Sequence, residues 1–285
     1  MARVQHYRRV VVMVREGHAL PPPFRLAAEL AHLLELELEG VFVEDEALVA
    51  LSAFPFAREL RLPGHTWQVL DPARMLEDLQ MAAGEARRLL AEAAARLGVA
   101  STFSVLRGDP HSAPAEQAGA EDILVLVEPG GGGVAAIRTL GAEFFRGTRS
   151  GVLLVPARPA APRGSVALLL PTEAAAVIEV AAALACASGE DVVLIVPENE
   201  VSSEAEIAGA LRREGVPAER LRRRRVPGRD AGSIIGALRA AGARIVVLDR
   251  AGYGADLQDF LGRLLGEAGT AVLLLGEVRP PRTAP

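Results

Sequence analysis

The chain alternates short apolar runs, many of them β-branched, with longer segments rich in alanine and leucine. The short runs predict strands at 9–14, 39–43, 102–106, 123–127 and 152–155, and then at 166–170, 191–196, 221–226, 244–249 and 271–275. The longer segments predict helices at 24–36, 76–97, 173–188, 204–214, 231–241 and 257–268. This order is typical of βαβ units on a parallel sheet.

The helix predicted at 76–97 has the clearest periodicity. Its apolar residues recur every three or four positions, which indicates one buried face. Gly98 follows directly, and glycine is the residue that most often ends a helix.

The pattern is written twice. The run from Ser150 to Pro156 returns as Thr270 to Gly276, and Asp122 to Leu126 returns as Arg244 to Leu248. We therefore predict an α/β protein of two doubly wound, mainly parallel five-stranded domains in tandem, at 1–158 and 164–285, with a Pro- and Ala-rich junction between them.

The first copy carries an insertion at about 46–76 that the second copy lacks. It contains the only tryptophan, Trp67, and several other large apolar residues. So apolar a segment is unsuited to a solvent-exposed loop without contacts. We therefore expect it to fold over the first domain, for example as a lid over a ligand cleft, or to contact a second chain.

Composition narrows the functional classes. A length of 285 residues with 50% hydrophobic and 24% charged residues suits two folded domains. No apolar run approaches the length of a membrane helix, and the N-terminal residues lack the apolar core of a signal peptide, so we expect a cytoplasmic protein without membrane insertion. The single cysteine, Cys186, excludes intramolecular disulfides, and we expect it to be buried in its apolar helix.

Reactive side chains are scarce. The sequence has no lysine, which excludes a Walker lysine, Schiff-base chemistry and a lysine base. All five histidines lie in the first half, the last being His111. The net charge of −5 argues against a nucleic-acid partner. We interpret the one basic run, Arg222 to Arg225, as alternating solvent-facing positions on an edge strand.

The order of elements resembles the universal stress protein family in its tandem form. The resemblance rests on Gly108-Asp109-Pro110 after the third strand, a glycine-rich turn after the fourth, and the terminal run Val152-Leu153-Leu154-Val155. It covers nearly the whole chain apart from the insertion, and it implies domains of the adenine-nucleotide alpha hydrolase-like fold. In the second copy, Pro227 to Asp230 takes the place of Gly-Asp-Pro.

The resemblance also implies where an adenine nucleotide would bind. Family members that bind ATP carry an aspartate at the end of strand one and a spaced glycine motif closed by Gly-Ser or Gly-Thr after strand four. Here strand one ends in Val14-Arg15 and Pro171-Thr172 in the two copies, so neither has the aspartate. A glycine turn still lets backbone N–H groups approach phosphate. The first copy retains the candidate site, formed by Gly130, Gly131, Gly132, Gly133, Arg138 and Thr139.

The same loop in the second copy is less suited to an anion. Gly252-Tyr253-Gly254 begins the motif, but Asp256 and Asp259 would repel phosphate where the helix opens. ATP or another adenine nucleotide is therefore expected in the first domain or nowhere, and a ligand-free mobile loop remains the alternative for the four glycines. We identify no catalytic residue, and the carboxylates Glu44, Asp45, Glu46, Glu198 and Glu200, without a histidine beside them, indicate surface charge and no metal site.

Two functional interpretations remain. The first is a non-enzymatic stress-response or regulatory protein that binds a protein or a small ligand and binds ATP weakly or not at all. The alternative is a nucleotide-dependent hydrolase or transferase that uses the loop after strand four. We also expect the two terminal strands to join the copies into an intramolecular pseudo-dimer, and a homodimer of whole chains stays open.

Overall fold

A computed structural model describes residues 6–15, 21–61, 66–110, 112–127, 148–156, 163–169, 175–198, 204–250 and 256–276. The first half consists of the strands β1 (Arg9–Arg15), β2 (Glu37–Asp45), β5 (Ser101–Gly108), β6 (Asp122–Val127) and β7 (Gly151–Val155) and the helices α1 (Pro21–Leu34), α3 (Pro72–Leu97) and α4 (Ala113–Gln117). Its insertion forms α2 (Glu46–Ser52) and the hairpin of β3 (Arg58–Arg61) and β4 (Thr66–Val69).

The second half repeats the order without the insertion. Its strands are β8 (Ser165–Leu169), β9 (Val192–Pro197), β10 (Leu221–Val226), β11 (Ala243–Asp249) and β12 (Ala271–Leu275). Its helices are α6 (Ala175–Ser188), α7 (Glu204–Arg213), α8 (Ala231–Ala241) and α9 (Leu257–Arg263), with the short 3-10 helix η2 (Ala218–Arg220) and the π-helical segment η4 (Leu264–Ala268).

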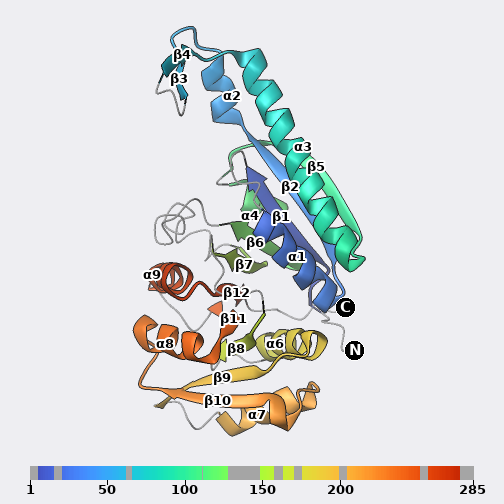
Figure 1. Cartoon of the computed structure of the whole chain (residues 1–285), viewed down its shortest axis with the longest axis vertical. Coiled ribbons are helices and arrows are strands. Elements are labelled where there is room, and N and C mark those ends of the chain that lie inside the picture. Colours follow the sequence, from blue (N-terminus) through green and yellow to red (C-terminus); the bar gives the residue numbers. More distant parts are fainter. Residues whose placement is uncertain are drawn as a thin grey trace, which may run out of the picture.

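All the strands apart from the hairpin lie in one ten-stranded sheet, in the order β10-β9-β8-β11-β12-β7-β6-β1-β2-β5 (Figure 1). Neighbouring strands within each half run parallel. The halves meet where β12 pairs with β7 antiparallel, with Leu273 opposite Leu153. The α/β fold of two doubly wound half-sheets predicted from the sequence is confirmed, and their terminal strands make the two half-sheets continuous.

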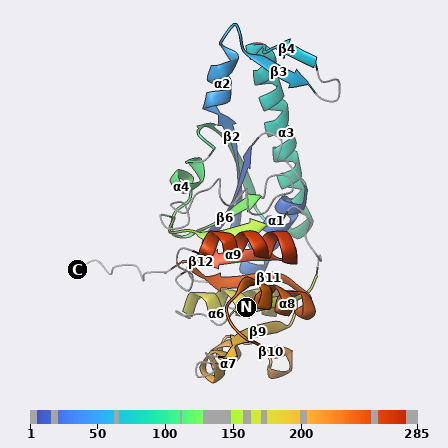
Figure 2. The ribbon, with the colours of Figure 1, turned by 90° about the vertical axis from the view of Figure 1, so that its left-hand side faces the viewer.

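Both faces of the sheet are covered by helices, as a mainly parallel sheet requires. Helices α1, α3, α6 and α7 pack on one face and α4, α8 and α9 on the other (Figures 1 and 2). Strands β7, β8, β9, β11 and β12 are therefore buried along their described length. None of the described helices is both long enough and apolar enough to cross a membrane.

Local sequence sets the ends of the helices. Asp71 accepts a hydrogen bond from the Ala73 N–H at the start of α3, and Gly98 ends the helix with φ at 68°, a conformation that favours glycine. In the second half, Asp230 caps α8 through the Ser233 N–H. The predicted stop at Gly98 is confirmed.

The insertion forms an arm, which we define as residues 46–61 and 66–71. Helix α2 packs against α3, and the hairpin lies beyond the carboxyl end of β2 (Figure 1). Helix α2 packs on the first domain with Val49 against its core, so this part of the expectation is confirmed. The rest does not cover the domain, because Phe56 is 75% and Trp67 64% exposed. Contact with a second chain stays a prediction.

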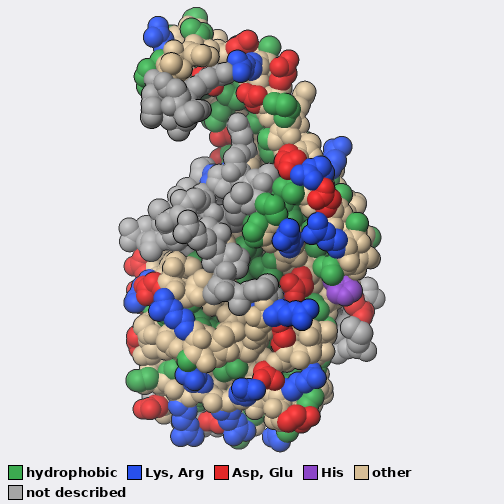
Figure 3. Space-filling view, in the orientation of Figure 1, with side chains coloured by type: hydrophobic (Ala, Val, Ile, Leu, Met, Phe, Trp, Pro, Cys, Tyr) green, Lys and Arg blue, Asp and Glu red, His purple; other side chains and the backbone are tan. Residues whose placement is uncertain are grey.

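Two other expectations have different outcomes. Strand β10 lies at an edge of the sheet as predicted, and its arginines gather at that end of the molecule (Figure 3). Arg222 pairs with Asp191, and Arg223 and Arg225 pair with Glu204. Cys186 is exposed, so the expectation of burial was wrong. Helix α6 is apolar almost all round, and its periodicity therefore could not show which side faces solvent.

Candidate functional site at the carboxyl edge of the first half-sheet

The strand order locates a crevice in each half. In the first half, β1 lies between β2 and β6, so the connections that leave β1 and return to β6 lie on opposite sides of it. In the second half β8 lies in the same way between β9 and β11. Doubly wound proteins bind ligands outside the carboxyl ends of the strands at this switch point. The candidate site of the first half is therefore bordered by the ends of β1 and β6.

The residues predicted for the anion site follow β6. Strand β6 ends at Val127, and Gly130, Gly131, Gly132, Gly133, Arg138 and Thr139 all lie outside the described residues. His111 and the second-half run Gly252-Tyr253-Gly254 lie outside them as well. The topology places the end of β6 at the crevice, and the glycine segment with its contacts stays a prediction.

Arg15 is the described side chain best placed at this crevice. It is the last residue of β1, lies beside Val43 of β2 and is half-buried. Among the described residues its guanidinium has no hydrogen-bond or ion-pair partner. Sequence reasoning treated Arg15 only as the loss of an aspartate, although its position at the end of strand one signalled that it replaces a carboxylate by a cation. A guanidinium at this position favours a negatively charged ligand group. A ligand group that donates a hydrogen bond would instead need the acceptor that the carboxylate supplied.

The carboxylates near this edge are engaged in structural contacts. Asp45 accepts hydrogen bonds from the Ala47 and Leu48 N–H groups at 2.9 and 3.3 Å and so caps α2. Glu44 pairs with Arg107 of β5 at 3.2 Å. Within the described part of the chain, no group of three or more histidine, cysteine, aspartate or glutamate residues is placed to hold a metal ion.

The turn between β5 and α4 forms another border of the site. The Asp109 carbonyl accepts a hydrogen bond from the Ala113 N–H, which fixes the chain as it enters the short helix α4. Ser112 precedes that helix without a side-chain cap. The Gly-Asp-Pro motif therefore shapes a turn between β5 and α4 through its backbone.

The corresponding edge of the second half is arranged differently. Arg250 follows β11 and donates hydrogen bonds across the molecule to the carbonyl oxygens of Thr148 and Ser150, just before β7. Burial lowers the pKa of Arg250. Asp256 and Asp259 lie at the start of α9, as the sequence predicts. Arg250 therefore joins the two halves, and acidic residues open helix α9.

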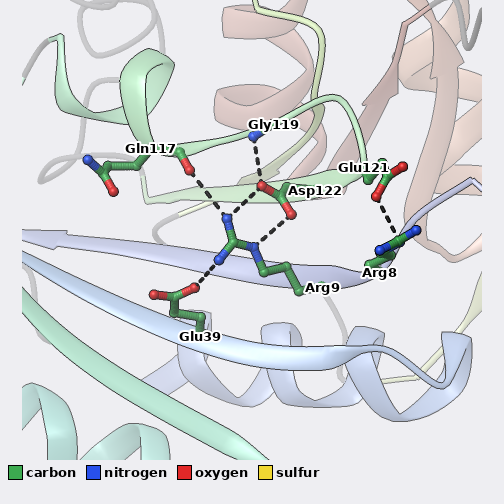
Figure 4. A network of polar contacts seen from close by, with 7 residues as sticks. All are labelled: Arg8, Arg9, Glu39, Gln117, Gly119, Glu121 and Asp122. Atoms are coloured by element: carbon green, nitrogen blue, oxygen red, sulfur yellow. Dashed lines mark hydrogen bonds and ion pairs between the residues drawn. The ribbon is translucent and has the colours of Figure 1, made fainter.

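A second polar cluster lies at the opposite edge of the sheet (Figure 4). Arg9 donates to both oxygens of Asp122, at 2.8 and 3.0 Å, and also pairs with Glu39. Asp122 in turn accepts the Gly119 N–H at 2.7 Å. Because these contacts join the amino ends of β1, β2 and β6, the cluster is remote from the carboxyl edge and stabilises the sheet.

Comparison with known proteins adds evidence about the fold. No protein-family model and no curated protein matches the sequence. Among solved structures, a universal stress protein from Archaeoglobus fulgidus DSM 4304 is 12% identical, with a TM-score of 0.66, and covers 96% of this chain and 98% of its own. The fold is that of a two-domain universal stress protein. A protein provisionally described as a universal stress protein, from Pseudomonas aeruginosa UCBPP-PA14, gives a TM-score of 0.56 at 16% identity and covers 96% of this chain and 94% of its own.

Both matches extend over the two halves, so the tandem arrangement is shared with the universal stress proteins. The structural resemblance anticipated from Gly108-Asp109-Pro110 and the terminal strands is confirmed. The TM-scores establish the fold, and because the identities are only 12% and 16%, function has to be argued from the site.

Proposed function

We propose that the chain is a non-enzymatic stress-response or regulatory protein that acts by binding a protein or a small ligand, with weak or absent ATP binding. The observation that carries this proposal is Arg15 at the end of β1, where a cation lies at the crevice in place of an acid. Loss of one charge-assisted hydrogen bond to a ligand weakens affinity by about 10- to 100-fold.

The rest of the described crevice supports the same proposal. Glu44 is held in an ion pair with Arg107 and Asp45 in a helix cap, so both carboxylates serve structural contacts. The proposal assigns any adenine nucleotide to the first domain, at Gly130 to Gly133 with Arg138 and Thr139. Arg250 and Asp256 disfavour the second domain, because one is bonded to carbonyls and the other is negative.

Titration calorimetry with ATP, ADP and AMP tests the proposal. Wild-type protein should bind weakly or not at all, and Arg138→Ala should weaken any binding by about 10- to 100-fold. Arg213→Ala, at an exposed position of α7, is the matched control and should leave affinity unchanged. Tight binding that survives Arg138→Ala, or that is lost on changes near Asp256, would contradict the assignment.

Phosphate release measured on the same samples distinguishes a non-enzymatic binding protein from a nucleotide-dependent enzyme. A non-enzymatic protein should show no turnover above the buffer rate. Sustained hydrolysis or transfer that disappears in Arg138→Ala would instead favour a nucleotide-dependent enzyme acting at the loop after β6.

We further propose that the chain is an intramolecular pseudo-dimer. The antiparallel pairing of β7 with β12 supports this, since two equivalent strands from the two halves face one another. Amide hydrogen exchange should protect Leu153 and Leu273 to the same free energy, because they would open together. Exchange of one strand at a lower free energy than the other would argue for halves that open separately.

A further inference from the structure

The open edge of the first half-sheet, strand β5, differs from the other edge. Strand β10 carries four consecutive exposed arginines, a charged edge of the kind that prevents strand addition. Strand β5 has no charged residue from Ser101 to Leu106, and most of it is exposed, Val105 by 46%. A strand of this length and composition presents unpaired backbone groups to a further strand.

The side chains of β5 are self-complementary. If two copies of β5 pair antiparallel about a twofold axis at Ser104, Phe103 lies opposite Val105 of the other copy, Thr102 opposite Leu106, and Ser101 opposite Arg107. Aromatic and β-branched residues form favourable cross-strand pairs, and no like charges on β5 face one another in this register. Val105 would then be covered by the Phe103 ring of the other copy.

Helix α3 is suited to the same arrangement. Its two flanks differ, because Glu85, Arg88 and Glu92 form an ion-pair network on one side. The opposite flank lies over β5, since Arg87 on it contacts the Phe103 ring, with 5.2 Å between Cζ and the ring centre. Between Arg87 and Arg88 the outer surface of α3 carries the exposed small residues Gly84 and Ala91, each three or four positions from both arginines.

The spacing of the helices is compatible with direct contact. Helix α3 packs on both β2 and β5. Paired strands lie about 4.8 Å apart, so two α3 helices related through a β5 pair would be roughly 10 Å apart. Packed helices lie about 8–10 Å apart, and small residues permit that approach. Gly84 of one copy would face the region of Ala91 in the other.

The molecule already contains a junction of this type. Its two half-sheets join where β7 and β12 pair antiparallel. We infer that two copies of the chain associate through antiparallel pairing of β5 with β5 about Ser104, so that the ten-stranded sheets become continuous and the α3 helices pack together. This inference is independent of whether the chain binds a nucleotide.

A charge-swap experiment tests both the surface and the register. Sedimentation analysis should show a wild-type dimer. Ser104→Lys and Ser104→Glu each place like charges opposite one another at the axis, and each should raise the dimer dissociation constant at least about tenfold. An equimolar mixture of the two variants should restore dimerisation, because the charges are then opposite.

The controls distinguish other interfaces. Ala205→Lys and Ala205→Glu, at an exposed position on α7 at the far end of the sheet, should leave the dimer intact. Circular dichroism should show that the Ser104 variants stay folded. The inference is overturned by a monomeric wild type, by a dimer that survives Ser104→Lys but is lost in Trp67→Ser of the arm, or by variants that fail to recombine.

Discussion

The fourth strands of the two halves, β6 and β11, carry opposite charges at equivalent positions near their amino ends. In the first half Asp122 of β6 binds Arg9, which belongs to the same half. In the second half Arg244 of β11 pairs with Glu190 at 2.6 Å and also with Glu29 of α1, in the first half, at 3.0 Å. The residue at this repeated position therefore pairs with a strand of its own half in the first copy. In the second copy it forms an ion pair between the two halves.

The environments of these two clusters differ as well. The Arg244 side chain is 5% exposed, whereas Arg9 is 37% exposed. Burial raises the pKa of Glu29 even though Arg244 lies beside it. Removal of Arg244 would leave Glu190, whose side chain is 16% exposed, without its cation in a poorly hydrated environment, so the more sensitive ion pair lies at the junction.

Arg244→Met should have the largest effect. It leaves Glu29 and Glu190 without their cation, and breaking a buried pair costs about 3–5 kcal/mol of unfolding free energy. Urea denaturation at pH 7 measures the loss. Since the raised pKa of Glu29 would rise further, the folded variant holds its proton more tightly than the unfolded chain, and the deficit should shrink as the pH is lowered.

The control for this prediction is the double variant Arg244→Met with Glu190→Gln, which removes one of the unpaired charges and should recover part of the loss. A loss under about 1 kcal/mol in the single variant would show that the junction does not depend on this ion pair.

Tyr7 gives the next largest effect, at alkaline pH. Burial raises its pKa to about 12 from an ordinary value of 10.0. The neutral phenol makes its full contribution to the free energy of unfolding below pH 10, and this contribution is lost as the pH rises through about 12. A shift of this size corresponds to about 3 kcal/mol. Tyr7→Phe should remove this loss. Because the chain has no lysine, few other groups titrate in this window.

The measurement for Tyr7 is urea denaturation at several values between pH 9 and pH 12. Tyr253→Phe, which changes the other tyrosine, is the matched control and should keep the alkaline loss. Equal alkaline losses in wild type and Tyr7→Phe would show that the phenol ionises without cost to the folded state.

Asp122→Asn tests the cluster within the first half and should cost less than Arg244→Met. The amide retains the shape of the carboxylate but weakens the bonds from Arg9 and the Gly119 N–H, so we expect about 2 kcal/mol. Arg9 can be hydrated because it is 37% exposed. Thermal or urea unfolding measures the loss of unfolding free energy. A loss as large as that of Arg244→Met would show that the two clusters do not differ in their contribution to stability.

The smallest effect is expected on the outer surface of α3. Arg88 pairs with Glu85 and Glu92 where all three side chains are exposed. Pairs of this kind contribute little because water and salt screen them. Arg88→Gln should therefore leave the urea midpoint unchanged within error, and a clear shift would mean that this flank of α3 is covered by a partner.

Sequence reasoning was most successful where a local pattern repeats. Strands β10 and β12 begin and end as predicted, and Gly98 ends α3 because a left-handed residue is needed there. It was less successful for α1, which begins at Pro21 rather than at Phe24, since three prolines obscure the start. Cys186 was misplaced because α6 has no polar face from which its orientation can be read.

The candidate site shows the same division. The sequence indicated the missing aspartate and the glycine segment after the fourth strand, and the predicted residues from Gly130 to Thr139 stay predictions. The role of Arg15 was missed, because a strand-end arginine acquires meaning only when its neighbours are known. The topology supplied that information by ordering β6, β1 and β2 side by side.

The sequence by itself determined the elements and the duplication, because hydrophobic periodicity, caps and repeated runs act over a few residues. It also predicted that the two terminal strands join the copies. Only the tertiary structure decided that β12 pairs with β7 antiparallel, that Trp67 of the arm stays exposed and that Arg244 reaches Glu29. These outcomes depend on contacts between residues far apart in the chain. Periodicity fixes which face of a segment is apolar, but only packing determines what that face meets.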